Sequence, residues 1–60
     1  MIGYKITCMD NNTDKEVLAT IVGELFVENG TIYIPVRDVS HIWLASFGLH
    51  DKIEYSDGNE

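Results

Sequence analysis

The stretch that decides the fold is residues 24–36, which read ELFVENGTIYIPV. Asn29-Gly30 lies between two runs that are rich in β-branched and aromatic residues. This dipeptide is the preferred centre of a type I′ turn, because both central residues of that turn adopt positive φ. The sequence therefore predicts a β-hairpin that pairs Val27 with Ile32, Phe26 with Tyr33, and Leu25 with Ile34.

The two faces of this hairpin differ in composition, since side chains alternate along a strand. One face is aliphatic and is expected to point into the core; it carries Leu25, Val27, Ile32 and Ile34. The other face is expected to point outward and carries Phe26 and Tyr33 with Glu24, Glu28 and Thr31. A rigid aromatic pair within an acidic rim is typical of a protein-binding surface, although such pairs also occur in sheets without any partner.

The residues before the hairpin are predicted to form two more strands. Residues 3–9 alternate in polarity, as a half-buried strand does, and residues 10–14 (DNNTD) form a turn. Residues 15–22 allow two interpretations. Their β-branched residues favour a strand, whereas Thr13 and Glu16 form a capping-box pattern that would begin a helix. We favour the strand.

A helix is predicted after the hairpin, over residues 37–47. Pro35 fits the end of the preceding strand, because it has no N–H to donate to a neighbour, and Gly48 fits a helix C-cap. On a helical wheel one continuous arc contains Val39, Ile42, Trp43, Ser46 and Phe47. Residues 52–55 alternate again and suggest a short last strand, and residues 56–60 are expected to be a frayed tail.

These elements predict an α+β fold, with a small antiparallel sheet of three or four strands and one helix packed on one face. The chain of 60 residues forms a single domain, residues 1–60. The expected core consists of Leu25, Val27, Ile32, Ile34, Val39, Ile42, Trp43 and Phe47, with Ile6, Leu18 or Ile21, and Ile53. A chain of this size buries only about 60% of its unfolded surface, so its stability is marginal and self-association would help.

The charge of the chain limits its partners. Ten acidic residues and four basic ones give a net charge of −6. The basic residues are scattered, so no basic patch is expected to bind nucleic acid directly or to adsorb on an anionic membrane. A larger protein with a basic surface is the expected partner. A single cysteine, together with the lack of a signal-like or membrane-spanning segment, suggests a cytoplasmic protein.

No motif of catalysis or cofactor binding is apparent, and we expect no enzyme activity, cofactor or metal. Residues 10–14 resemble the start of an EF-hand loop, but Lys15 and Ile21 stand where that loop needs Gly and Glu. Cys8 is expected to be a buried structural residue, and neither His41 nor His50 is expected to serve it as a base. A fold of this size also offers little concavity for a ligand.

Residues 28–39 (ENGTIYIPVRDV) resemble the hairpin-to-helix segment of bacterial stalk domains related to the N-terminal domain of copper amine oxidases. Lys52-Ile53-Glu54-Tyr55 would correspond to their closing strand. The resemblance implies a strand–turn–strand–helix order. Residues 37–48 are about one helical turn longer than that pattern, and the family's domains are extracellular.

Two hypotheses for the function follow. The first is a small acidic, non-catalytic protein-binding module of the kind that phages encode to inhibit host restriction or CRISPR enzymes, in which carboxylates imitate nucleic-acid phosphates on a basic surface. Its expected partner-binding residues are Phe26, Tyr33, Glu24, Glu28, Asp10, Asp14 and Glu16. The alternative is a structural or self-assembling subunit, such as a homodimer, with the outer hairpin face buried between protomers.

Overall fold

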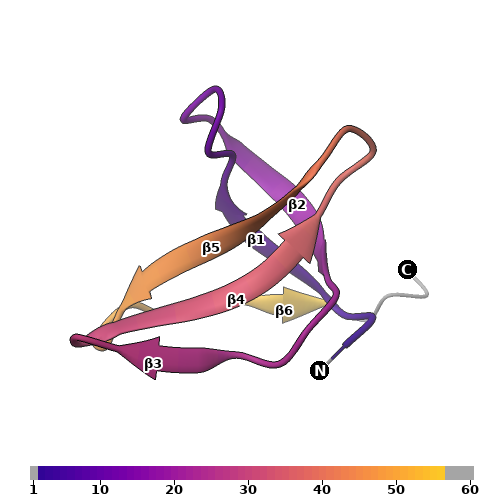
Figure 1. The fold of residues 1–60 in the computed structure, drawn as a ribbon. Helices are drawn as coiled ribbons and strands as arrows, with labels where there is room; N and C mark the ends of the chain where they lie inside the picture. Colours follow the sequence, from indigo (N-terminus) through magenta and orange to yellow (C-terminus); the bar gives the residue numbers. More distant parts are fainter. Residues whose placement is uncertain (1, 57–60) are drawn as a thin grey trace.

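The computed structural model describes residues 2–56, and every regular element in this range is a strand. The strands are β1 (Lys5–Met9), β2 (Glu16–Ile21), β3 (Phe26–Glu28), β4 (Thr31–Arg37), β5 (Ile42–Gly48) and β6 (Tyr55–Ser56). They form one curled antiparallel sheet, a half-barrel, in which β4 and β5 lie side by side (Figure 1). The described residues contain no helix that is long and apolar enough to cross a membrane.

Strand β4 is the centre of the sheet. Along one edge it pairs with the whole of β5. Along its other edge it pairs first with β3 and then, near its end, with β2. Strand β2 continues to β1, and β1 to the short β6. The curl brings β1 back toward β5, where the indole N–H of Trp43 donates a hydrogen bond to the carbonyl oxygen of Met9 at 3.1 Å.

Pro35 lies inside β4, so the prediction that it ends the strand was wrong. The amide N–H of Val22 donates to the Pro35 carbonyl oxygen at 2.9 Å, but Pro35 has no N–H to return. The ladder on this edge of β4 breaks there, between β2 and β3. The chain turns away at Gly23, where a Cβ atom would lie 3.0 Å from Cγ of Pro35. A proline in a central strand is therefore tolerated at the one point where the neighbouring strand changes.

The core lies on the inner side of the curl, and its residues alternate with more exposed ones along β1, β2, β4 and β5. Its buried apolar residues are Ile6, Cys8, Ala19, Ile21, Ile34, Val36, Trp43 and Ala45, with Val17, Ile32, Phe47 and Ile53 packed partly against them. Full burial of a side chain the size of isoleucine contributes about 1.5–3 kcal/mol. Among residues 2–56, thirteen large apolar side chains are exposed and eight apolar residues are buried, so more large apolar groups lie outside than inside.

The predicted helix over residues 37–47 is absent, and the α+β class is therefore wrong. Strand β5 occupies most of this segment, with Trp43 and Ala45 buried and Leu44 exposed between them. The helical arc had placed Val39 and Ile42 in the core, whereas their side chains are 102% and 68% exposed. Aromatic and β-branched residues in 42–47 favoured a strand, and their pairing with β4 decided the outcome.

The turn before β5 explains why the segment looked helical. Oδ1 of Asp38 accepts the backbone N–H groups of Ser40, at 2.8 Å, and of His41, at 3.0 Å. A side chain that accepts N–H groups two and three residues later is also the pattern of a helix N-cap. In this protein the same hydrogen bonds close the β4–β5 hairpin instead.

The hairpin at Asn29-Gly30 is confirmed. The φ values of 52° and 79° are those that a type I′ turn requires, and the predicted partners of Phe26 and Val27 are found. Residues 15–22 contain a strand, as favoured. The last strand begins at Tyr55, later than predicted. Of the expected tail, Ser56 belongs to β6, and residues 57–60 lie outside the described residues.

Several core assignments need correction as well. Leu25 lies just before β3, outside the ladder, and both Leu25 and Val27 are exposed. They flank the open end of the half-barrel, where no helix covers them. Between the two alternatives Leu18 and Ile21, the buried residue is Ile21. Val36, Ala19 and Ala45 were not expected in the core, whereas Cys8 is buried as expected.

Candidate functional site

We use the name outer face for the side of β3, β4 and β5 that points away from the core. Its side chains lie in rows across the strands, because residues directly opposite one another in a sheet share a face. In one row Phe26 of β3 is opposite Tyr33, which is opposite Ser46 of β5. In the next row Pro35 is opposite Leu44.

The aromatic pair lies on the outer face, as expected. The rings of Phe26 and Tyr33 stack with centroids 5.3 Å apart and an angle of 25° between their planes. The Phe26 side chain is nevertheless 43% exposed, and Tyr33 is half-buried. Stacking fixes the orientation of both rings, so a partner would order few additional rotamers on contact.

The apolar surface continues onto β5. Leu44, which is 50% exposed, lies beside Pro35, and the still more exposed Ile42 is opposite Arg37. Sequence reasoning missed these residues because it placed them on a helix. Their alternation with Trp43 and Ala45 was the signal that could have found them. One apolar strip therefore crosses the three strands and consists of the exposed Phe26, Leu44 and Ile42 with the half-buried Tyr33 and Pro35.

The two ends of this strip carry opposite charges. At the β3–β4 turn, Glu28 is exposed and pairs with Thr31. At the other end, Lys5 and Arg37 flank Thr20 on the same face of the sheet. These two cations border a shallow groove of about 600 Å³ lined by Lys5, Val17, Leu18, Thr20, Arg37, Asp38 and Val39. Among the described residues, neither cation forms an ion pair.

The expected partner-binding residues fall into two groups. Phe26, Tyr33 and Glu28 lie together on the outer face, and the exposed Glu24 precedes β3. The other three lie in the β1–β2 hairpin: Asp10, Asp14 and Glu16. Asp10 is only 7% exposed, and its Oδ1 accepts the backbone N–H of Asn12 at 2.7 Å. The Asp10 side chain therefore stabilises the turn that contains it and exposes little of its carboxylate to a partner.

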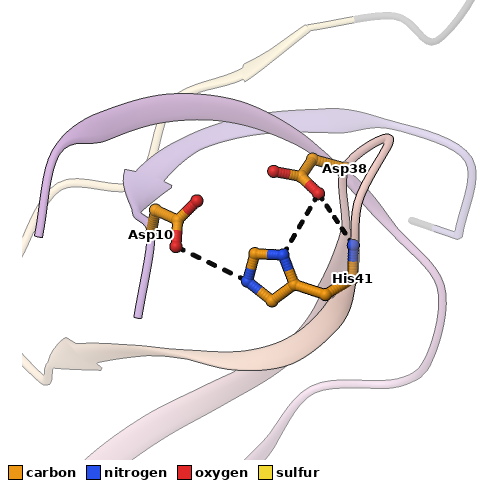
Figure 2. A group of neighbouring side chains, drawn as sticks. All are labelled: Asp10, Asp38 and His41. Atoms are coloured by element: carbon orange, nitrogen blue, oxygen red, sulfur yellow. Dashed lines mark hydrogen bonds and ion pairs between the residues drawn. The ribbon is translucent and has the colours of Figure 1, made fainter. Parts of the chain in front are cut away.

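A second cluster joins the β1–β2 loop to the β4–β5 loop. His41 lies between two carboxylates, with Nε2 at 3.5 Å from Oδ1 of Asp10 and Nδ1 at 3.4 Å from Oδ1 of Asp38 (Figure 2). The imidazole ring also stacks on Trp43, with centroids 4.5 Å apart. Sequence reasoning placed His41 in solvent on a helix. No local pattern could reveal its contact with Asp10, which lies about thirty positions earlier in the chain.

Further hydrogen bonds complete this cluster. The Ser40 hydroxyl donates to Oδ1 of Asp38 at 2.9 Å and lies 2.8 Å from Nδ1 of His41. Nε2 of His41 is 2.9 Å from Oδ1 of Asn11. The donor and acceptor roles of the two ring nitrogens depend on the tautomer. In either tautomer, His41 bridges the β1–β2 loop and the β4–β5 loop.

The electrostatics of the Asp38 turn follow from the same contacts. The backbone N–H of Ser40 and then its hydroxyl hold the pKa of the Asp38 carboxyl below its usual range, with smaller effects from the N–H and charge of His41. Nearby, burial raises the pKa of the Cys8 thiol above its ordinary value, and the charges of Asp10 and Asp38 add to the increase. Cys8 is thus a neutral, buried side chain.

The cluster is a poor fit to a metal centre or a nucleophilic site. One ligand atom each of Asp10, Asp38 and His41 lie within 4.8 Å of one another. The ring, however, presents a different nitrogen to each carboxylate, whereas a histidine ligand binds one metal ion through one nitrogen (Figure 2). Ser40 and His41 both give their backbone N–H groups to Asp38, which leaves neither for an oxyanion.

The fold is more concave than its length suggested. At the open end of the half-barrel lies a cavity of about 470 Å³, lined by Ile2, Ile21, Gly23, Glu24, Leu25, Ile34 and Tyr55. The lining carries few polar groups and none of the clustered residues described above. The size of the fold alone is therefore no argument against a ligand.

Comparison with known proteins identifies no relative. No protein-family model, no curated protein and no solved structure matches the chain. The resemblance of residues 28–39 to the stalk domains also loses its support, because the helix that it implied is a turn followed by β5. The function must be inferred from the molecule itself.

Proposed function

We propose that this chain is a small, non-catalytic protein-binding module that docks on another protein chain through its outer face. The observation that carries the proposal is the apolar strip formed by Phe26, Tyr33, Pro35, Leu44 and Ile42. Scattered apolar residues on a surface need no explanation, but a contiguous strip with charged ends is typical of an interaction site.

The geometry of the strip favours a protein as its partner. It lies on the outside of the curled sheet and lines neither of the two hollows described above, whereas small-molecule sites are enclosed. One end of it is an oriented aromatic pair, and aromatic side chains are enriched among the residues that dominate binding energy. Burial of apolar surface contributes roughly 25 cal/mol per Å², and thirteen large apolar side chains are exposed among residues 2–56.

The acidic charge supports long-range attraction to a basic partner. At a net charge of −6, such attraction would weaken as salt rises through a few hundred millimolar, because the screening length shortens to a few ångströms. The more specific prediction, an inhibitor of the phage type that imitates nucleic acid on a restriction or CRISPR enzyme, rests on size and charge. It stays a prediction, as do the cytoplasmic location and the lack of enzyme activity.

The proposal is tested with three forms of the protein immobilised for capture from a cell lysate. These are the wild type, the double variant Phe26→Ala/Tyr33→Ala, and the control variant Met9→Ala, which changes an exposed apolar residue on β1. We expect a protein chain, either another protein or a further copy, to be retained by the wild type and the control and released by the double variant. Titration with that purified chain should show at least a tenfold loss of affinity, given that aromatic anchors contribute 2 kcal/mol or more.

Circular dichroism of the double variant shows whether the domain is still folded. Equal affinity of the wild type and a folded double variant for every retained chain would remove the outer face from the proposed function.

A further inference from the structure

We propose that the occupant of the outer face is a second copy of this chain, bound about a two-fold axis. This inference rests on the proposed function, because it names the partner of the same face. Its basis is the order in which charges and apolar groups follow one another along β4.

Four rows of side chains cross the outer face, and each has a different character. The first row, at the β3–β4 turn, is acidic and contains Glu28, Thr31 and Gly48. The second is aromatic and contains Phe26, Tyr33 and Ser46. The third is aliphatic and contains Pro35 and Leu44. The fourth is basic and contains Lys5, Thr20, Arg37 and Ile42.

This order makes the face complementary to itself. Successive rows are two residues apart along β4, or about 6.6 Å. A two-fold axis in the plane of contact, perpendicular to β4 and crossing it at Ile34, reverses the order of the rows. The acidic row of one copy then meets the basic row of the other, and each aromatic row meets an aliphatic row. The acidic–basic contact and the aromatic–aliphatic contact therefore each occur twice, as in any closed, isologous interface.

The sideways placement of the strands agrees with this arrangement. Such an axis keeps the same edge of β4 on the same side in both copies. Since β3 and β2 both pair with that one edge, β3 of one copy lies over β2 of the other. Glu28 therefore comes above Arg37 and Thr20 of the second copy, and the groove beside these residues lies open to receive it.

The basic row is what distinguishes a second copy from an unrelated basic protein. A partner with a uniformly basic surface would be attracted by the net charge of −6 and by Glu28 but repelled locally by Arg37 and Lys5. A second copy also has a net charge of −6, which opposes association at long range, but it offers an opposite charge to Glu28 and to Arg37 on contact. In a molecule with a net charge of −6, these two cations have no ion pair among the described carboxylates. A matching surface must be acidic at one end and basic at the other, with apolar groups between. The outer face of this chain meets that requirement.

The size of the face sets the expected strength of the dimer. Strands β4 and β5 have seven residues each and β3 has three. At about 3.3 Å per residue and about 4.8 Å between strands, they cover roughly 270 Å². Stable complexes bury about 800 Å² per partner, and smaller interfaces belong to weak, exchanging complexes. We therefore expect a dimer with a dissociation constant in the micromolar range, in exchange with its monomer.

Charge reversal in two separate variants tests the pairing of Glu28 with Arg37. The variants Glu28→Lys and Arg37→Glu each place like charges at both contacts of their own homodimer. An equimolar mixture of the two variants can form a mixed dimer with one copy of each. In that dimer one contact joins the two substituted residues and the other joins the native Glu28 and Arg37, so both contacts are attractive. Sedimentation equilibrium should show each variant alone dimerising at least tenfold more weakly than the wild type, and the mixture associating as the wild type does. Lys15→Glu changes the net charge as Arg37→Glu does, but in the β1–β2 loop, and should dimerise almost normally.

Three results would overturn the inference. One is a wild type that remains monomeric up to about 1 mM, where even a complex of −4.1 kcal/mol would be half formed. Another is a dimer that both charge reversals leave unchanged. The third is a mixture that associates no better than its components. If the wild type is monomeric but the Phe26→Ala/Tyr33→Ala variant still loses a captured protein, the proposed function stands and only the second copy is excluded. If the wild type is monomeric and the double variant retains every captured protein, both the proposed function and this inference fail.

Discussion

Trp43 and Met9, which lie thirty-four residues apart, are joined by a hydrogen bond of 3.1 Å from the indole nitrogen to the backbone carbonyl oxygen. Strands β1 and β5 do not pair through their backbones, so this side-chain bond takes the place of a ladder at the closing point of the half-barrel. The imidazole ring of His41 stacks on the same indole ring. Trp43 therefore both fills the core and holds the ends of the sheet together.

Replacement of Trp43 by phenylalanine should destabilise the fold. The change removes the hydrogen bond to Met9 and leaves a small cavity, which together cost about 1–3 kcal/mol. Urea denaturation followed by circular dichroism measures the loss. Val39→Ala, at a fully exposed position, should change the free energy of unfolding by less than about 0.5 kcal/mol. Equal stabilities of Trp43→Phe and the wild type would show that this bond does not close the sheet.

The contact between Gly23 and Pro35 predicts an interaction between two substitutions. A Cβ atom at residue 23 would lie 3.0 Å from Cγ and 3.1 Å from Cβ of the proline ring. Gly23→Ala should therefore cost about 1–3 kcal/mol through overpacking. In the background of Pro35→Gly, which removes both the Cγ and the Cβ atoms, the same change should cost markedly less. Additive effects in this double-mutant cycle would mean that the ring does not restrict residue 23.

The pKa of Asp38 predicts a pH dependence of stability. A carboxyl whose pKa is lower in the folded state stabilises the fold above its unfolded pKa, and this contribution is lost as the pH falls through the folded pKa. The pKa of Asp38 is lowered chiefly by the backbone N–H and hydroxyl of Ser40. Below about pH 4, the free energy of unfolding of the wild type should thus fall more steeply than that of Asp38→Asn. Parallel curves for the two proteins would contradict the role given to this turn.

Cys8 should be unreactive in the folded protein. Alkylation requires the thiolate, and burial raises the pKa of this thiol. At pH 8, modification by iodoacetamide should be far slower for native Cys8 than for the protein in urea. A control with an exposed thiol, Asn12→Cys in a Cys8→Ala background, should react at nearly the same rate in both conditions. Rapid labelling of native Cys8 would show that β1 opens readily.

The sequence predicted the elements whose signals are local. Asn29-Gly30 has one preferred conformation, and that turn fixed the register of Phe26 with Tyr33. The alternation of residues 3–9 and the β-branched density of 15–22 predicted β1 and β2. This register placed the two aromatic rings on one face, but the prediction that this face points outward relied on a helix over the opposite face, which is absent.

The rest depended on contacts that no local pattern contains. Residues 37–47 satisfy a helical arc and a strand alternation about equally well, and Asp38 makes the bonds of either a helix cap or a hairpin turn. Backbone pairing with β4, which is seven residues long, favours the strand over the helix. The same long-range pairing brings Leu44 and Ile42 to the outer face. His41 reaches Asp10 only because the sheet curls.

The most direct test of the docking surface is a pair of isotope-filtered NOE spectra on an equal mixture of labelled and unlabelled protein at millimolar concentration. We predict intermolecular cross-peaks between the Tyr33 ring of one copy and the Pro35 ring protons of the other, and none to Met9 or Leu49, which are exposed outside the outer face. Cross-peaks that instead join Met9 or Leu49 across copies, with the Tyr33 and Pro35 signals unchanged by concentration, would contradict this arrangement.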